Sequence, residues 1–262
     1  MDALWGSVSQ PVIGMVHLLP LPGAPRYGGS LDVVRTRALA DAEALAEGGV
    51  HGLMLENFGD VPFYPAAVPP HVVACLTALA CELIERVKLP LGINVLRNDG
   101  RAALGVAVAC GAQFIRVNVL CGSRVADQGL IHGIAHDLLR DRMVLGADVN
   151  IFADVDVKHS ASLAPRALSD EVADTLHRGL ADALIVSGTG TGRPTNPEHL
   201  RAVKLAAGNA PVFIGSGVTA ENIASYRAQA NGFIIGTAFK PGGDAGQPVD
   251  VARVRAVMAS VK

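Results

Sequence analysis

The chain has 262 residues, of which 22 are Lys or Arg and 24 are Asp or Glu. Its length is close to the roughly 250 residues typical of one α/β barrel, so we expect a single domain over residues 1–262. Neither sign of charge forms a block, which argues against nucleic acid as a partner.

Half of the residues are hydrophobic and only 4% are aromatic, a composition that suits helices packed closely on a buried parallel sheet. The most apolar stretch, Val72–Ile84, is interrupted by Thr77 and Glu82 and is too short to span a membrane. The N-terminus lacks the pattern of a signal peptide. We therefore expect a cytoplasmic protein, with peripheral membrane association left open.

Eight short apolar runs, each followed by a longer segment, predict a (β/α)8 TIM barrel of the α/β class. The predicted strands are Val12–Leu18, Gly52–Asn57, Leu91–Leu96, Phe114–Leu120, Asn150–His159, Ala183–Gly188, Val212–Gly217 and Gly232–Thr237. The predicted helices are Leu31–Glu47, Val72–Lys88, Arg101–Cys110, Asp170–Gly179, Pro197–Ala207, Ala220–Ala228 and Val251–Val261.

Three long connections follow the ends of predicted strands: Leu19–Gly29, Phe58–Pro70 and Cys121–Asp137. In a TIM barrel the loops after the strands build the active site, and long irregular loops are uncommon unless they are functional. We interpret the three as candidate lids. The alternative is that they are plain surface insertions.

Polar residues lie where a barrel interior is normally apolar. His17, Glu56, Asn57 and Asn94 stand at or near strand ends. Polar groups in such a position are costly unless they are paired or functional. A lone His is more often a core residue than a catalyst, and His17 stays open between the two.

The fourth and fifth strands carry the strongest signal. Period-two alternation places Arg116 and Asn118 on one face of the fourth strand, and Asp154, Asp156 and Lys158 on one face of the fifth. Opposite charges on a buried face stabilise each other and shift pKa values. We expect a reactive cluster, with an inert, fully paired polar plug as the alternative.

Glycine-rich turns follow the last three strands, at Ser187-Gly188-Thr189-Gly190-Thr191-Gly192, Gly215-Ser216-Gly217 and Gly236-Thr237. Glycine lets backbone amides approach one oxyanion, and the loops after strands seven and eight of a barrel commonly hold a phosphate. Thr219 is a plausible N-cap for the helix that follows. We predict a phosphate site here; alternatively the glycines only permit tight turns.

These motifs carry a resemblance. The last two turns resemble those of the ribulose-phosphate-binding barrels. The segment 14–23, GMVHLLPLPG, with Glu56-Asn57, Arg116-Val117-Asn118, Asp156-Val157-Lys158-His159-Ser160 and the Ser187-Gly188 turn, resembles the BtpA/SgcQ family from about Val12 to Lys240. The resemblance implies a phosphate-binding-type barrel. It also implies a role in photosystem I biogenesis for the cyanobacterial namesake and a link to sugar metabolism for SgcQ.

We expect an enzyme that acts on a small phosphorylated metabolite, a sugar phosphate or ribosyl compound, as an isomerase, a lyase or an enzyme that cleaves glycosyl bonds. Asp154 or Asp156 would be the general base, Lys158 the acid or electrostatic stabiliser, and Arg116 an orienting clamp. The further candidates are His17 and Glu56 for proton transfer, Asn94, Asn118, His159 and Ser187 for substrate, and Gly188, Gly190, Gly215, Ser216, Gly217, Gly236 and Thr237 for phosphate.

Several alternatives stay open. Lys158 would instead form a Schiff base with a carbonyl substrate. The spacing of His17, Glu56, Asp154 and His159 forms no known metal signature, so we assign no cofactor and leave a divalent metal and a metal-dependent hydrolase open. A non-catalytic assembly factor of the BtpA type is the rival from another class, and a homo-oligomer is possible in either case.

Overall fold

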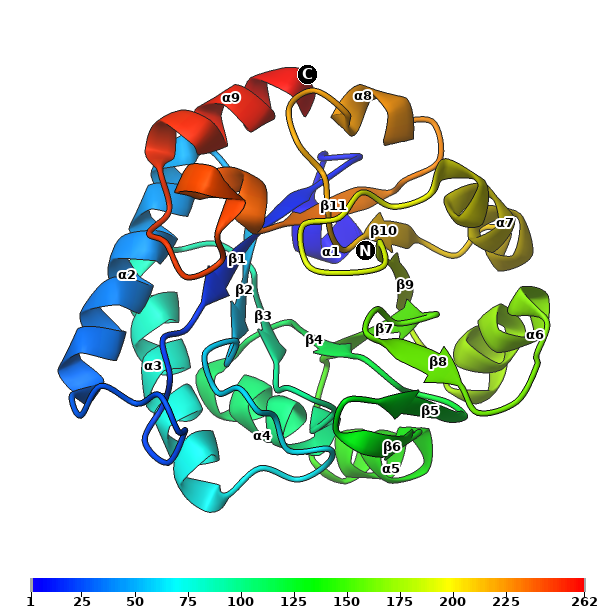
Figure 1. The fold of residues 1–262 in the computed structure, drawn as a ribbon, viewed down its shortest axis with the longest axis horizontal. Helices are drawn as coiled ribbons and strands as arrows, with labels where there is room; N and C mark the ends of the chain where they lie inside the picture. The colour runs from blue at the N-terminus through cyan, green and yellow to red at the C-terminus, as the bar shows by residue number, and fades with distance from the viewer. Residues whose placement is uncertain (1, 262) are drawn as a thin grey trace.

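The computed structural model describes residues 2–261 and contains one closed barrel of eight parallel strands with helices around it (Figure 1). The barrel order is β1-β2-β3-β4-β7-β9-β10-β11, with β11 closing onto β1. The strands are β1 Val12–His17, β2 Gly52–Glu56, β3 Leu91–Asn94, β4 Phe114–Val117, β7 Asn150–Val155, β9 Ala183–Val186, β10 Val212–Ile214 and β11 Gly232–Ile235. The predicted (β/α)8 fold is confirmed.

Helices connect successive strands on the outside of the barrel (Figure 1). The α-helices are α1 Asp2–Trp5, α2 Leu31–Gly48, α3 Pro70–Arg86, α4 Gly100–Cys110, α5 Ala135–Val144, α6 Leu168–Ala173, α7 Pro197–Ala207, α8 Ile223–Tyr226 and α9 Val251–Val261. A π-helical turn, Asp174–Arg178, continues α6, and short 3-10 turns cover Thr237–Phe239 and Pro241–Gly243.

Local sequence signals explain where the longer helices begin and end. Ser30 precedes α2 and its side chain accepts a hydrogen bond from the Val33 amide, while Gly49 ends the helix at φ 93°. Asp99 caps α4 through the Ala102 amide, and Gly111 ends it at φ 79°. These two helices therefore have a polar start and a glycine stop just before the next strand.

Two connections differ from the prediction. The segment Cys121–Asp137 is no structureless lid, because it contains the hairpin β5 Ser123–Ala126 and β6 Gly129–His132, and β8 Ser160–Ser162 pairs antiparallel with β5. This three-stranded sheet lies beside the barrel rim (Figure 1). The predicted helix Ala220–Ala228 shrinks to the four residues of α8.

Large rings and glycines fill the barrel interior together. The rings of Phe114, Phe152 and Phe213 follow one another, with centroids 4.9 and 5.0 Å apart. A Cβ on Gly92 would lie 2.1 Å from the Phe114 ring, and a Cβ on Gly232 would lie 2.3 Å from the Phe213 ring. These three rings thus fill much of the barrel interior and require small neighbours there.

The strand register brings the polar strand ends to one level. His17 pairs with Glu56, Glu56 with Asn94, and Asn94 with Arg116 across β1, β2, β3 and β4. Residues paired in this way point to the same face of a sheet, so these four side chains form one inward row at the carboxyl ends of the strands. The barrel below them is apolar.

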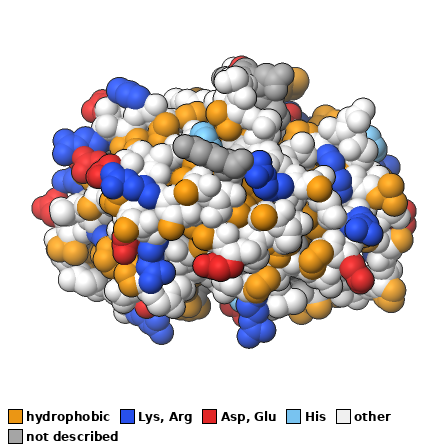
Figure 2. Space-filling model, turned by 90° about the horizontal axis from the view of Figure 1, so that it is seen from above, with side chains coloured by type: hydrophobic (Ala, Val, Ile, Leu, Met, Phe, Trp, Pro, Cys, Tyr) orange, Lys and Arg blue, Asp and Glu red, His pale blue; other side chains and the backbone are white. Residues whose placement is uncertain are grey.

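Charged side chains of both signs are interspersed on the outer face that Figure 2 shows. Among residues 2–261 no helix is both long and apolar enough to cross a membrane.

The tight contact between Gly92 and Phe114 gives a stability prediction. Gly92→Ala is expected to lower the free energy of unfolding by about 1–3 kcal/mol, because the added methyl group overpacks the barrel. Gly105→Ala, on the exposed side of α4 where a Cβ meets nothing, is expected to raise it by up to about 1 kcal/mol through helix propensity. Urea denaturation of both variants measures the difference; equal stability of the two would contradict this packing.

Candidate functional site

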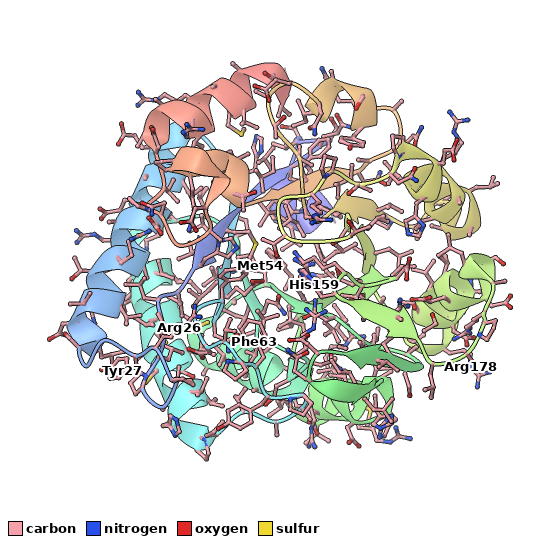
Figure 3. The ribbon with its side chains drawn as sticks, in the orientation of Figure 1. Arg26, Tyr27, Met54, Phe63, His159 and Arg178 are labelled. Carbon is pink, nitrogen blue, oxygen red and sulfur yellow. The ribbon has the colours of Figure 1, made fainter. Side chains whose placement is uncertain are left out.

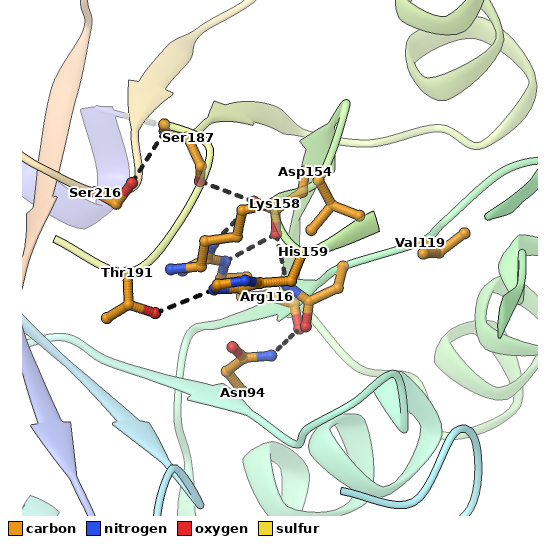
Figure 4. Close-up of polar contacts among 12 residues, drawn as sticks. Asn94, Arg116, Val119, Asp154, Lys158, His159, Ser187, Thr191 and Ser216 are labelled. Carbon is orange, nitrogen blue, oxygen red and sulfur yellow. Dashed lines mark hydrogen bonds and ion pairs between the residues drawn. The ribbon is translucent and has the colours of Figure 1, made fainter. Parts of the chain in front are cut away.

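A buried ion pair stands at the centre of the barrel mouth. Arg116 Nε and Nη2 donate to Asp154 Oδ2 and Oδ1 at 2.9 and 2.8 Å, and the two side chains are 3% and 0% exposed. Asn118 Nδ2 donates to Asp154 Oδ2 at 2.9 Å, and Ser187 Oγ donates to Oδ1 at 3.4 Å (Figure 4). Two-point contact of this kind fixes both side chains.

This pairing decides what Asp154 can do. Burial opposes the charged form of Arg116, but the Asp154 carboxylate raises the pKa of that guanidinium above its ordinary value. Both carboxylate oxygens of Asp154 accept hydrogen bonds from two or more donors. Asp154 therefore lies inward as expected, yet its geometry is that of a positioning residue and not of a free general base.

Asp156 is not part of the inward face, which corrects the sequence expectation. Strand β7 ends at Val155, and Asp156 takes a left-handed conformation with φ 48°. Its amide donates to Glu171 Oε1, and its carboxylate, 49% exposed, pairs with Arg124 of β5. The period-two alternation stops here because a left-handed residue cannot continue a strand.

Lys158 still reaches the barrel mouth, although by a turn and not by strand alternation. Its carbonyl oxygen accepts a hydrogen bond from Arg97 Nη2 at 2.6 Å. Burial, and then the positive charge of Arg116, lower the pKa of Lys158 to about 8, while Glu56 acts against that shift. Within the described residues its Nζ forms no hydrogen bond or ion pair, so it is open to a ligand.

Glu56 is the second unpartnered ionisable group. It is only 6% exposed, and burial raises the pKa of its carboxyl, with Arg116 and Lys158 opposing the shift. Its carboxyl has no hydrogen bond or salt bridge in the described part of the chain. A carboxyl with a raised pKa beside an amine with a lowered pKa is an arrangement typical of acid–base sites.

A cavity of about 300 Å³ opens in front of these groups. Four buried polar atoms of its lining residues have no hydrogen-bond partner among the described residues: Asn94 Oδ1, Asn118 Oδ1, Arg97 Nε and Gln128 Oε1. Buried polar atoms are rarely left unpaired without a reason. Its lining residues are Glu56, Phe58, Val61, Phe63, Asn94, Leu96, Arg97, Arg116, Asn118, Asp127, Gln128, Lys158, His159 and Thr191.

A small hollow adjoins this cavity at the glycine turns. Gly215, Ser216, Gly217, Gly236 and Thr237 all line it. The backbone amides of Gly217, Val218, Gly236 and Thr237 donate to no other group in residues 2–261. Glu56, Phe58, Arg116, Lys158 and Thr191 line both spaces. The amine and the carboxyl therefore stand between the glycine turns and the larger cavity.

The remaining glycines of the prediction lie differently. The amide of Gly188 is taken by Ser216 Oγ at 3.0 Å, and a Cβ there would strike Arg193 O at 2.2 Å. Gly190 lies beside Arg193 and His159 and is not in the lining of the hollow. Thr219 is not an N-cap, since α8 begins only at Ile223. The expected contribution of a helix N-terminus is absent from this arrangement.

His17 lies in the small hollow with its ring 4.7 Å from that of Phe58. Burial, followed by the charges of Lys240 and Lys158, holds the pKa of His17 well below its ordinary value. Its Nδ1 is buried and has no partner in the described residues. A Cβ on Gly236 would lie 2.6 Å from His17 Cε1, so the glycine makes room for a neutral imidazole.

His159 is exposed at the opening of the larger cavity, with Nε2 3.5 Å from Thr191 Oγ1 (Figures 3 and 4). Burial and the nearby Lys158 lower its pKa. No three His, Cys, Asp or Glu side chains in residues 2–261 come together as a metal-holding group. His17, Glu56, Asp154 and His159 therefore do not assemble into the ligand set left open by the sequence.

Sequence reasoning missed several lining residues. Arg97, only 5% exposed, follows the third strand in a loop where alternation gives no direction. Phe58 and Asp127 come from two connections that we expected to act as lids. The lengths of those loops were the only available signal. Thr191 and Gly192 belong to the predicted glycine-rich turn after β9, and both line the small hollow.

Comparison with known proteins adds relatives over nearly the whole chain. The BtpA family model matches residues 8–262. The photosystem I biogenesis protein BtpA of Synechocystis is 49% identical, covering 96% of this chain and 88% of the relative. An uncharacterised protein of Thermococcus kodakarensis is 46% identical, covering 97% and 95%. A mitochondrial uncharacterised protein of Caenorhabditis elegans is 33% identical, covering 97% and 94%.

Solved structures share the barrel. A native KDPGal structure superposes with a TM-score of 0.59 at 17% identity, covering 98% of this chain and 97% of the other. Phosphoribosyl anthranilate isomerase from Thermus thermophilus gives a TM-score of 0.54 at 13% identity, covering 96% and 98%. At this identity the likeness extends to the fold alone.

The central ion pair gives a stability prediction. Asp154→Asn leaves the buried Arg116 without a charged partner and is expected to cost about 3–5 kcal/mol of unfolding free energy. The double variant Arg116→Met, Asp154→Leu removes both charges and is expected to recover at least half of that loss. Chemical denaturation of the three proteins measures this; a single variant as stable as the wild type would contradict the pairing.

The shifted amine gives a pH prediction. Because the pKa of Lys158 is lowered to about 8, its labelling by acetic anhydride is expected to be half-maximal near pH 8. Peptide mass spectrometry after labelling across pH 6–11 follows each lysine separately, and the exposed Lys88 reports the reagent's own behaviour. A midpoint for Lys158 near about 10.4, the usual value for lysine, would show that the site does not shift it.

Proposed function

The chain belongs to the BtpA family, and on that premise we propose that it is an enzyme acting on a small phosphorylated, hydroxyl-bearing metabolite. The reaction takes place at the barrel mouth by acid–base chemistry. One observation carries the proposal: an open carboxyl, Glu56, and an open amine, Lys158, line the same site. The glycine-lined hollow lies on one side of them and the larger cavity on the other.

The small hollow suits a phosphate. Four backbone amides, of Gly217, Val218, Gly236 and Thr237, are without partners, and an oxyanion is the ligand that such amides bind best. The cationic Arg116 also lines this space and favours a dianion. We place the phosphate of the substrate here, as an anchor remote from the reacting atoms.

The larger cavity suits hydroxyl groups. Asn94 Oδ1 and Asn118 Oδ1 are unpaired acceptors, and Arg97 Nε is an unpaired donor. A sugar hydroxyl both donates and accepts a hydrogen bond, so it can satisfy either kind of atom. A chain of hydroxyl groups extending from the phosphate would satisfy all three.

The two open ionisable groups supply the proton transfers. Burial raises the pKa of Glu56, which strengthens this carboxylate as a base and suits the group to proton transfer with a developing oxyanion or leaving group. Lys158 lies close enough to Arg116 and Glu56 for their charges to act on it. Asp154 and Arg116 act as positioning residues that keep this arrangement in place.

A role as an assembly factor alone accounts poorly for these features. The relatives described above come from an archaeon and an animal as well as from a cyanobacterium, and photosystem I is absent from the first two. A docking protein also gains nothing from unpaired buried atoms inside a barrel. A small-molecule site accounts for both observations.

Ligand-induced stabilisation tests the substrate class. D-ribose 5-phosphate at saturating concentration is expected to raise the melting temperature by several degrees, since binding at 100 times Kd adds about 2.7 kcal/mol. D-ribose at the same concentration is expected to add much less, because it lacks the phosphate. Thr237→Val is expected to reduce the shift, whereas Thr77→Val, on the outer helix α3, is expected to leave it unchanged. No shift with any phosphorylated sugar would refute the proposal.

Substitutions of the two open groups test catalysis. Glu56→Gln is expected to keep the melting-temperature shift while lowering turnover by about 10²–10⁴-fold, the usual contribution of a general acid–base residue. Mass spectrometry of a phosphorylated-sugar library incubated with wild-type or variant protein measures turnover. Glu82→Gln, on the half-exposed side of α3, is the matched control. Full turnover by Glu56→Gln would exclude Glu56 from the chemistry.

A further inference from the structure

Two buried lysines of the barrel share one electrostatic property and differ in their contacts. Burial lowers the pKa of both Lys158 and Lys240 to about 8. Lys240 is 0% exposed, donates to Ala245 O at 2.7 Å and lies 3.9 Å from Asp41. Lys158 has neither contact and opens to both spaces of the site. The Lys240 amine is thus occupied by contacts within the protein, whereas the Lys158 amine is accessible to a ligand.

Burial, and after it the charge of Arg116, favours the neutral amine of Lys158 and lowers its pKa. Arg97 acts in the same direction, while Glu56 and Asp154 favour the ammonium form. The charge of Asp154 is paired with Arg116 through two short hydrogen bonds. Burial raises the pKa of the Glu56 carboxyl. Lysines desolvated beside other cations are the ones that serve as nucleophiles.

We propose that Lys158 is a covalent catalyst that forms an imine with a carbonyl carbon of the substrate, and that Glu56 transfers the protons this requires. The inference rests on the proposed function and narrows it: the phosphorylated substrate must reach the site as an aldehyde or ketone. A phosphate in the small hollow and hydroxyl groups in the larger cavity place the intervening carbon chain alongside Lys158, which lines both.

The step balances with the groups present. The lone pair of Nζ forms the C–N bond as the carbonyl π pair moves onto oxygen. Glu56 enters the step as the carboxylic acid. It gives its proton to that oxygen and takes one from the nitrogen, which leaves a neutral carbinolamine and Glu56 protonated again. The protonated Glu56 then gives its proton to the hydroxyl, the C–O bond breaks and water leaves. The nitrogen lone pair forms the C=N bond, which leaves an iminium and a Glu56 carboxylate.

An imine accounts for features that a purely electrostatic lysine leaves unexplained. A lysine that only stabilises negative charge works best as an ammonium, and its site would then raise its pKa. Here a buried arginine stands beside it and has the opposite effect. The iminium carries the positive charge next to Glu56, where a base is needed to remove a proton from the adjacent carbon.

Borohydride trapping tests the inference on the full-length chain. The protein is incubated with D-ribose 5-phosphate or dihydroxyacetone phosphate and then reduced with sodium borohydride. The expected product is a single adduct, the mass of one probe less one oxygen atom, mapped to Lys158 by peptide mass spectrometry. Lys240 and the exposed Lys88 in the same digest are expected to remain unmodified, because one is enclosed and the other has no site around it.

Variants make the outcome specific. Lys158→Met is expected to abolish the adduct, and Glu56→Gln to slow its formation at least tenfold at pH 7.5, since the proton shuttle is lost. D-ribose without phosphate is expected to give at least tenfold less adduct. An adduct that forms equally on Lys88, or that persists in Lys158→Met, would overturn the inference as non-specific glycation.

The same probes separate this inference from the proposed function. A rise in melting temperature with no adduct at Lys158 would overturn the imine and leave a phosphorylated-substrate enzyme that works without covalent catalysis. The absence of both would overturn the proposed function and the imine together. An adduct with a rise in melting temperature supports both.

Discussion

The site depends on one buried ion pair between Arg116 and Asp154. Because neither side chain reaches water, each charge requires the other. Their two-point contact links β4 to β7, and Asn118 and Ser187 add hydrogen bonds from the segments that directly follow β4 and β9. Burial lowers the pKa of His17 and of Lys158, and the positive charge of Arg116 lowers both further. Burial raises the pKa of Glu56, and Arg116 opposes that shift. One pair therefore both braces the mouth of the barrel and sets the charge of the groups within it.

Strand periodicity predicts the barrel and the inward side chains of its fourth and fifth strands. Alternation correctly predicts that Arg116, Asn118 and Asp154 point inward, because β4 and β7 are regular up to Val117 and Val155. Alternation fails at the residue after Val155. Asp156 takes a left-handed conformation, and its carboxylate pairs with Arg124 outside the barrel mouth. Lys158 does line the site, but it does so from the turn after β7 and not by strand alternation. Periodicity could not predict the direction of Arg97, because this residue lies in a loop. It also could not predict the hairpin β5–β6, because each of its strands is only four residues long.

The two-ended site separates binding from chemistry. In the proposed function, backbone amides at the glycine turns bind the phosphate and anchor the substrate at a distance from its reacting atoms. The unpaired amide oxygens of Asn94 and Asn118 lie at the other end. Between them stand Glu56 and Lys158, an open carboxyl and an open amine that line both spaces. Interactions at both ends can hold one carbon chain across these groups, which is how remote binding energy assists a reaction.

The most direct test of this arrangement is a crystal structure of the protein soaked with D-ribose 5-phosphate. The expected density places the phosphate within hydrogen-bond distance of the Gly217, Val218, Gly236 and Thr237 amides, with the first sugar carbon beside Lys158 Nζ. Sugar hydroxyl groups should meet Asn94 Oδ1 and Asn118 Oδ1. A ligand bound at another surface, or with its phosphate in the larger cavity and its sugar away from Lys158 and Glu56, would contradict the account.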